Sequence, residues 1–234
     1  RLSFEDVTGE DLNWFFNQWF LSPGHAELSV QKLYENDTLT VTITQNQDSL
    51  YTPLFKIPSD IELLFENEEK QNVSILIEGH KTIVKIPLVE EPIAVVLDSE
   101  QSILGVIDYE KPFEENISVF KNANKYQLRY DALDALIVDF SNTNYALRSD
   151  DGVKSDSEKE FIDDINDQVL DIFILALDDK SEHIRNHALL ALIGYNLKKE
   201  LKLTQKFIQL AQEDKSSMVR AAAISGLSAI YDLD

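Results

Sequence analysis

One eight-residue frame occurs three times in the C-terminal half of the chain and constrains the fold more than any other feature. Each copy reads Arg-x-x-Ala-Leu/Ile-x-x-Leu, and the copies begin at Arg129, Arg185 and Arg220. The last two copies lie 35 residues apart, and an Asp-Lys-Ser segment precedes each of them. Such a period is typical of helical hairpins, in which a small alanine lets helices approach and the larger aliphatic residues fill the seam. The sequence therefore predicts an α-helical repeat domain over residues 112–234, with each frame on the second helix of a hairpin.

Residues 25–111 have the alternation of β-strands instead. In 39–44, 61–65 and 73–77 every second residue is apolar, which is the period of a half-buried strand. Asn36-Asp37 is a hairpin-turn sequence, and a second turn is expected at 78–80. The more continuously apolar segments 93–97 and 103–107 are expected as central strands. Seven or eight short strands at this spacing predict an antiparallel, immunoglobulin-like β-sandwich.

Residues 1–24 are expected to form one amphipathic helix. Thr8 is predicted as its N-cap, and Ser22-Pro23-Gly24 as its end. The face of this helix consists of Leu12, Phe15, Phe16, Trp19 and Phe20, with Trp14 beside it. A helix with so many aromatic residues needs a packing partner. Since the chain begins with Arg1 rather than Met, we expect a fragment of a longer protein, with this face partly exposed.

The composition excludes several classes of function. The chain has 21 Lys and Arg against 42 Asp and Glu, a formal net charge of −21, whereas nucleic-acid binding requires a basic surface. The chain has no cysteine, so disulfides, thiolate metal sites and cysteine nucleophiles are excluded. This leaves a cytoplasmic or a periplasmic location equally open. No apolar run is long enough to span a bilayer, so no membrane segment is expected.

Histidine and the acidic clusters are weak candidates for chemistry. His183 and His187 have the i, i+4 spacing of metal ligands, but Ile184 stands where the hydrolytic zinc motif requires glutamate. We therefore expect exposed helix residues rather than ligands. The acidic segment 150–158 does not match a calcium-binding loop. The paired carboxylates at 114–115, 163–164 and 178–179 are expected to be solvated charges at helix ends.

The three frame arginines have two interpretations. In the first, each guanidinium joins neighbouring turns by pairing with a carboxylate such as Asp179 or Asp214. In the second, a concave repeat surface presents the arginines to a peptide carboxylate. We favour the structural interpretation.

The segment from Asp11 to Gly24 resembles the end of the catalytic domain in gluzincin zinc aminopeptidases of the aminopeptidase N type. There a D-L-x-x-F-F-x-x-W helix is followed by a Gly-x-Pro turn into a β-sandwich; this chain departs at Ala26, where the family has proline. Residues 93–98 and 103–104 are similar to the closing strands of that sandwich. The repeated frames correspond to the family's C-terminal HEAT-like superhelix.

The resemblance implies a division into residues 1–24, the terminal helix of a catalytic domain, 25–111, the β-sandwich, and 112–234, the HEAT-like domain. The family's H-E-x-x-H motif, downstream glutamate and Gly-x-Met-Glu-Asn strand do not occur here. The resemblance therefore places catalytic, cofactor-binding and metal-binding residues, with the zinc ion, upstream of Arg1. This part would cap the active site and restrict the entry of peptide substrates. The contact with its own catalytic domain would run through Trp14, Phe15, Phe16 and Trp19.

Two other hypotheses stay open. Family relatives that have lost catalysis act as scaffolds in transcription-initiation complexes, and this chain has the same order of parts. Alternatively, the chain is an unrelated adhesion or docking module, which predicts that residues 1–24 pack wholly against the sandwich. For the chain by itself we expect neither peptidase activity nor stoichiometric zinc.

Overall fold

The computed structural model describes residues 1–148, 167–194 and 201–231. The chain divides into two compact units, 1–115 and 116–234. All the strands described lie in the first unit, and the second is helical throughout its described residues. The predicted order, β followed by α, is confirmed. Within the described ranges, no helix combines the length and the apolar character that crossing a membrane requires.

The N-terminal segment differs from the single predicted helix. It contains α1 (Leu2–Thr8), α2 (Asn13–Phe16) and the π-helix η1 (Asn17–Leu21). The predicted N-cap at Thr8 is wrong, because Thr8 ends α1 and donates its hydroxyl hydrogen to the Phe4 carbonyl at 2.9 Å. Gly9 follows with φ of 72°, and its N–H donates to the Glu5 carbonyl at 2.8 Å. Thr8 and Gly9 therefore form the C-terminal cap of α1.

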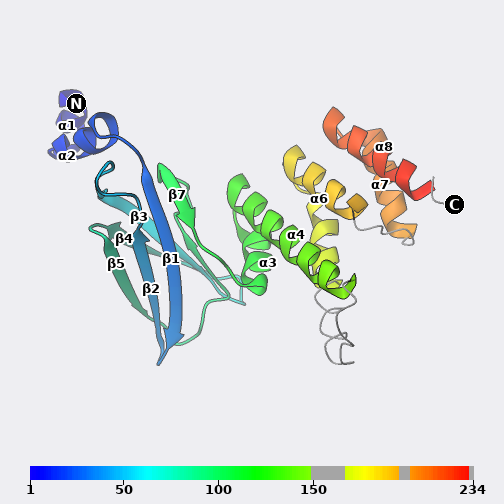
Figure 1. Ribbon diagram of the computed structural model, residues 1–234, viewed down its shortest axis with the longest axis horizontal. Helices are drawn as coiled ribbons and strands as arrows, with labels where there is room; N and C mark the ends of the chain where they lie inside the picture. The colour runs from blue at the N-terminus through cyan, green and yellow to red at the C-terminus, as the bar shows by residue number, and fades with distance from the viewer. Residues whose placement is uncertain (149–166, 195–200, 232–234) are drawn as a thin grey trace. The chain divides into compact units, whose positions relative to one another are not determined.

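Seven strands form two sheets in the first unit (Figure 1). The strands are β1 (Ala26–Glu35), β2 (Thr38–Gln45), β3 (Ile57–Leu64), β4 (Lys70–Ile77), β5 (Lys81–Pro87), β6 (Ala94–Leu97) and β7 (Gly105–Asp108). One sheet has the order β5-β2-β1-β7 and the other β4-β3-β6. The segments 93–97 and 103–107 were expected as central strands, but β6 and β7 are edge strands. The hairpin predicted at Asn36-Asp37 is confirmed, with φ of 49° and 55° at the two turn residues.

Strand β1 is paired on both sides, antiparallel to β2 and parallel to β7. The prediction that all the strands are antiparallel is therefore wrong for the β1–β7 pair. Ala26 at the start of β1 is aligned with Gly105 at the start of β7. A Cβ atom on Gly105 would lie 2.4 Å from the Ala26 carbonyl oxygen, so this approach of two backbones requires glycine.

The inward faces of the two sheets share one hydrophobic core. The alternation predicted for 39–44 is confirmed, because Leu39, Val41 and Ile43 are at most 1% exposed while the threonines between them are half-buried. Phe55, in the segment before β3, is also fully buried. The core therefore draws on both sheets and on a connecting segment.

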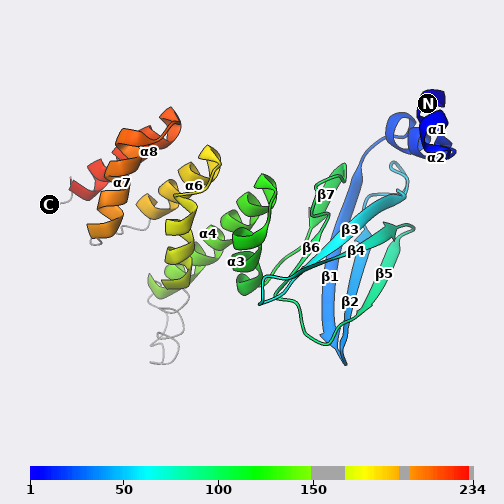
Figure 2. The same cartoon turned by 180° about the vertical axis from the view of Figure 1, so that it is seen from behind.

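The second unit consists of successive antiparallel helices (Figures 1 and 2). They are α3 (Phe113–Asn122), whose first residues belong to the first unit, α4 (Tyr126–Arg148), a helix at 167–176, α6 (Glu182–Gly194), α7 (Leu201–Glu213) and α8 (Ser217–Tyr231). The three frames lie on α4, α6 and α8, each the second helix of a pair, as predicted. The frame alanines Ala132, Ala188 and Ala223 are at most 3% exposed.

Candidate functional site

The aromatic N-terminal segment is fixed to the sheets by Gln18 and Trp19. The Gln18 side-chain amide pairs twice with the backbone of Lys56: Nε2 donates to the carbonyl at 2.9 Å, and Oε1 accepts from the N–H at 2.6 Å. The Trp19 ring stacks on Phe55, with 4.9 Å between ring centroids. Gln18 and Trp19 thereby tie η1 to the segment before β3.

The aromatic side chains of this segment are all partly accessible to solvent. Phe15 is 37% exposed and Phe20 68%, while Trp14, Phe16 and Trp19 are half-buried. Partial exposure of this face was expected and is confirmed. The docking-module hypothesis predicted that residues 1–24 pack wholly against the sheets, and the exposure of Phe20 contradicts it.

An apolar hollow of about 540 Å³ adjoins this face. Its lining residues are Trp14, Phe15, Trp19, Phe20, Ile57, Pro58, Ser102, Ile103 and Leu104. Phe4 of α1, which is 62% exposed, extends this apolar surface, because its ring lies 6.2 Å from that of Phe16 and Phe16 stacks on Phe20 at 5.3 Å between centroids. A contiguous apolar surface of this kind is typical of a protein-interaction site.

Glu115 corrects an expectation from the sequence. It was predicted as solvated charge, but its side chain is only 2% exposed. Oε1 accepts hydrogen bonds from the Val95 N–H at 2.8 Å and the Tyr109 hydroxyl at 3.0 Å, and Oε2 forms an ion pair with Lys32. Burial of Tyr109, together with the adjacent Glu115 charge, raises the pKa of the Tyr109 hydroxyl. The group is a buried, structurally paired carboxylate.

In the second unit, two frame arginines each bind an aspartate of the following hairpin. Arg129 donates to Asp179 through Nε at 2.9 Å and Nη2 at 3.2 Å. Arg185 donates to Asp214 in the same way at 2.7 and 2.8 Å. These side chains are 5–14% exposed, so the bidentate pairs are largely removed from water. The structural interpretation of Arg129 and Arg185 is confirmed.

The third guanidinium nitrogen of each arginine donates hydrogen bonds to backbone carbonyls in the turn of its own hairpin. Nη1 of Arg185 donates to the Asp179 carbonyl and Nη1 of Arg220 to the Asp214 carbonyl, both at 2.8 Å. The aspartates also begin the next helix, since Asp214 Oδ1 accepts from the Ser216 N–H at 2.8 Å. Hydrogen bonds from Arg185 hold the pKa of Asp214 below its usual value. We call this arrangement the arginine–aspartate ladder.

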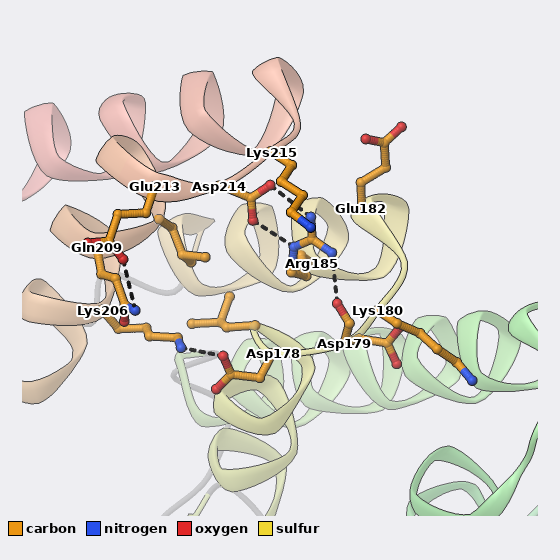
Figure 3. Close-up of a pocket in the computed structure, with 12 residues that line it drawn as sticks. Asp178, Asp179, Lys180, Glu182, Arg185, Lys206, Gln209, Glu213, Asp214 and Lys215 are labelled. Carbon is orange, nitrogen blue, oxygen red and sulfur yellow. Dashed lines mark hydrogen bonds and ion pairs between the residues drawn. The ribbon is translucent and has the colours of Figure 1, made fainter.

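A polar hollow of about 660 Å³ lies beside the ladder (Figure 3). Its labelled side chains are Asp178, Asp179, Lys180, Glu182, Arg185, Lys206, Gln209, Glu213, Asp214 and Lys215. Cations and carboxylates are interspersed, and Lys206 forms an ion pair with Asp178. Because Arg185 is committed to Asp214 and to the Asp179 carbonyl, the hollow does not present that arginine to a peptide carboxylate.

The two spaced histidines lie at the contact of α4 and α6 rather than in a metal site. His187 Nε2 lies 3.0 Å from Asp134 Oδ1, and its ring stacks on Tyr130 with 4.9 Å between centroids. His183 is exposed beside Tyr126. Among the residues that the structure describes, no three His, Asp or Glu side chains are grouped so that they could hold a metal ion. The acidic segment 150–158 and the pair at 163–164 lie outside the described residues.

No protein-family model and no curated protein sequence matches the chain. A solved structure does: the crystal structure of Legionella pneumophila aminopeptidase A in complex with aspartic acid. The TM-score is 0.64 at 15% sequence identity, and the match covers 99% of this chain and 30% of the aminopeptidase chain. The chain therefore has a fold that also occurs in an aminopeptidase, and it spans less than a third of that protein's length.

Proposed function

We propose that the chain is the non-catalytic C-terminal region of a zinc aminopeptidase of the aminopeptidase N type. The observation that carries this proposal is the fold match over 99% of the chain to part of an aminopeptidase. In the proposal, the two sheets are an immunoglobulin-like β-sandwich and the helical unit is a HEAT-like repeat. The peptide-hydrolysing chemistry and the zinc ion belong to a domain outside residues 1–234.

The apolar N-terminal face has the properties expected of the surface that meets this catalytic domain. Trp19 and Gln18 hold the segment on the sheets, which leaves Phe15 and Phe20 directed to solvent. Docking would bury this apolar surface. The proposed role is architectural: the sandwich holds the helical repeat over the catalytic cleft and restricts which peptides enter.

The first test is to sequence the reading frame upstream of Arg1 and assay the longer protein. We expect a His-Glu-x-x-His helix with a later glutamate, one zinc ion per chain, and chelator-sensitive hydrolysis of an aminoacyl-p-nitroanilide. Residues 1–234 alone should contain no stoichiometric zinc and hydrolyse nothing. An upstream sequence unrelated to peptidases would refute the proposal, and chelator-sensitive hydrolysis by residues 1–234 alone would refute the non-catalytic role.

The second test concerns the docking face in that longer protein. Phe20→Ser should increase proteolytic cleavage near residues 1–24, because the face loses its apolar contact. Ile83→Ser is the matched control, since Ile83 is 54% exposed on β5 and outside the face. Equal cleavage of the two variants would exclude Phe20 from the contact.

A catalytically inactive scaffold of the same architecture is the second candidate. The exposed apolar face is consistent with the scaffold, because an interaction surface of this kind does not require that the attached domain retain its zinc ligands. An upstream domain of aminopeptidase type in which the H-E-x-x-H residues are replaced would decide for the scaffold.

A further inference from the structure

The buried carboxylate of Glu115 is contacted from three separate segments of the first unit. Lys32 lies on β1, Val95 on β6 and Tyr109 directly after β7, and β1 and β6 belong to different sheets. The Glu115 side chain is 2% exposed and the Lys32 side chain 20%. We call these four residues the Glu115 cluster. The cluster holds an amine and a carboxyl group together with little access to water.

Lys32 stands on the inward side of β1. The side chains of a strand alternate between its two faces, and Ala26, Leu28 and Val30, at the preceding alternate positions, are buried in the hydrophobic core. A lysine in this register is unusual, because its ammonium group loses water and needs a partner in the protein. That partner is Glu115, since Lys32 Nζ lies 2.5 Å from Glu115 Oε2.

The first carboxyl oxygen of Glu115 is held by two donors. Oε1 accepts hydrogen bonds from the Val95 N–H at 2.8 Å and from the Tyr109 hydroxyl at 3.0 Å. Burial of Tyr109, and then the adjacent Glu115 charge, raise the pKa of the hydroxyl, so this group remains a donor. Two fixed donors on one oxygen are the arrangement that stabilises the negative charge of a tetrahedral intermediate in acyl transfer.

The second carboxyl oxygen, Oε2, faces the lysine. Oε2 has no hydrogen-bond partner among the described residues, although Lys32 Nζ lies within hydrogen-bond distance. The contact therefore lacks the alignment of a hydrogen bond. An amine and an acyl group that the fold holds in contact react as if both were at very high concentration. The cluster thus combines a nucleophile, an acyl carbon, and donors for the oxygen that becomes charged.

We propose that the Glu115 cluster is the site of an intramolecular cross-link, an amide bond between Lys32 Nζ and Glu115 Cδ. Transfer of a proton from Nζ to Oε2 converts the ion pair into a neutral amine and a carboxylic acid, which removes two buried charges. The amine nitrogen then attacks Cδ, and the electron pair of the C=O bond moves to Oε1, where Val95 and Tyr109 stabilise it. When this carbonyl re-forms, the Cδ–Oε2 bond breaks, and Oε2 leaves as water with the carboxyl proton and one amine proton.

The step is balanced without a further reactant, because an amine and a carboxylic acid give one amide and one water molecule. In the product, the amide oxygen keeps the donors of Oε1, and no charge stays buried in the pair. Hydrolysis of the amide would require water to return to a side chain that is 2% exposed. The cross-link would join β1 to the start of α3, and the inference does not depend on the proposed aminopeptidase relationship.

The first measurement is the intact mass of the 234-residue chain, denatured after it has folded. We expect a mass lower than the sequence mass by one water molecule. In a tryptic digest, the peptide that ends at Lys32 should be missing, because trypsin does not cleave after an acylated lysine, and a branched peptide should join residues 32 and 115. A folded chain that keeps its full sequence mass on prolonged incubation would overturn the proposal, and so would a cross-link between other residues.

Lys32→Arg separates the cross-link from the ion pair. A guanidinium group can still pair with Glu115, but it is not a nucleophile, so this variant should fold and keep the full sequence mass. Lys70→Arg is the matched control: Lys70 pairs with Glu62 at 3.4 Å, but its side chain is 31% exposed, and this variant should lose water as the natural chain does. Loss of water by Lys32→Arg would show that a different amine reacts and would overturn the proposal.

The rate of water loss tests the role given to Oε1. Tyr109→Phe removes one of its two donors and keeps the ring. Cross-linking of the newly made chain, followed by intact mass during cell-free synthesis, should therefore slow by about 100-fold. Tyr34→Phe is the control, because Tyr34 is outside the cluster and its hydroxyl donates to the Leu88 carbonyl at 3.1 Å. Equal rates for the two variants would overturn the mechanism proposed for Oε1.

Discussion

Arg185 and Asp214 form a bidentate pair across 29 residues of sequence, with nitrogen–oxygen distances of 2.7 and 2.8 Å. The pair connects the second helix of one hairpin to the turn of the next. With the carboxylate also accepting from the Ser216 N–H, the same aspartate joins two hairpins and begins α8. The ladder is therefore a polar link that recurs between successive hairpins.

Removing Arg185 should destabilise the helical unit. Arg185→Ala leaves Asp214 largely buried without its guanidinium, and breaking such a pair costs about 3 kcal/mol. Urea unfolding followed by circular dichroism at 222 nm measures the loss, because helices dominate that signal. Lys180→Ala, at an exposed residue of the turn before α6, is the control and should change the unfolding free energy by less than about 0.5 kcal/mol. Equal effects would show that the pair contributes little.

The ladder should also give the helical unit an acid limit. The pKa of Asp214 is lowered from 3.8, chiefly by the hydrogen bonds from Arg185. A carboxyl with a depressed folded-state pKa stabilises the fold fully above its unfolded value, and this contribution is lost as pH falls through the folded value. The difference in urea midpoint between the natural chain and Asp214→Asn should therefore be constant above pH 5 and shrink below pH of about 4. A difference that persists at pH 2 would contradict this assignment.

Gly226→Ala should destabilise α8 although alanine is the better helix former. A Cβ atom at residue 226 would lie 2.6 Å from Phe207 Cε2 and 3.0 Å from Ile193 Cγ1. Overpacking of this kind costs about 1–3 kcal/mol, more than the gain of about 1 kcal/mol in helix propensity. Ser225→Ala, on the exposed side of the same helix, should be neutral or slightly stabilising. A lower urea midpoint for Gly226→Ala alone is the expected result.

Glu115→Ala should destabilise the first unit by about 3 kcal/mol, because it leaves the Lys32 ammonium and the Val95 N–H without their acceptor. Both tryptophans lie in the first unit, so fluorescence unfolding reports on this unit. Adding Lys32→Met should recover part of the loss, since the unpaired charge is then gone. Glu114→Ala, at the adjacent exposed residue, is the control. A double variant as unstable as Glu115→Ala alone would show that the ion pair with Lys32 is unimportant.

The ladder was predictable in outline because its residues recur with the repeat. Arg185 and Asp214 each stand in a fixed relation to a frame, so the pairing of one hairpin's arginine with the next hairpin's turn aspartate follows from the period. Two local patterns in the first unit were also sufficient: the two-residue period predicted the buried alternation of Leu39, Val41 and Ile43, and the turn residues predicted the hairpin at Asn36-Asp37.

Other features depend on contacts that no local pattern encodes. The donors around the Glu115 carboxylate come from β1, β6 and the Tyr109 hydroxyl. Lys32 and Val95 are distant from Glu115 in sequence, so an acidic pair at a helix start looked like solvated charge. Thr8-Gly9 is compatible with a helix start or a helix end, and the hydrogen bond from Thr8 to the Phe4 carbonyl decides for the end. Arg220 donates to two backbone carbonyls and to no side-chain carboxylate of the described residues, a difference that is visible only by comparison with Arg129 and Arg185.

The parallel pairing of β1 with β7 sets the order in which the chain becomes native. Ala26 and Gly105 are paired although nearly the whole sequence of the first unit lies between them. The pairing of β1 with β7 therefore cannot be completed until Asp108 has left the ribosome. Contacts of such long sequence separation form slowly because a large loop must be closed first. The helical hairpins, by contrast, join residues close in sequence and fold from local contacts. Strand β1 is thus synthesised early and completed late, because the edge that pairs with β7 stays unpaired until residues 105–108 have been synthesised.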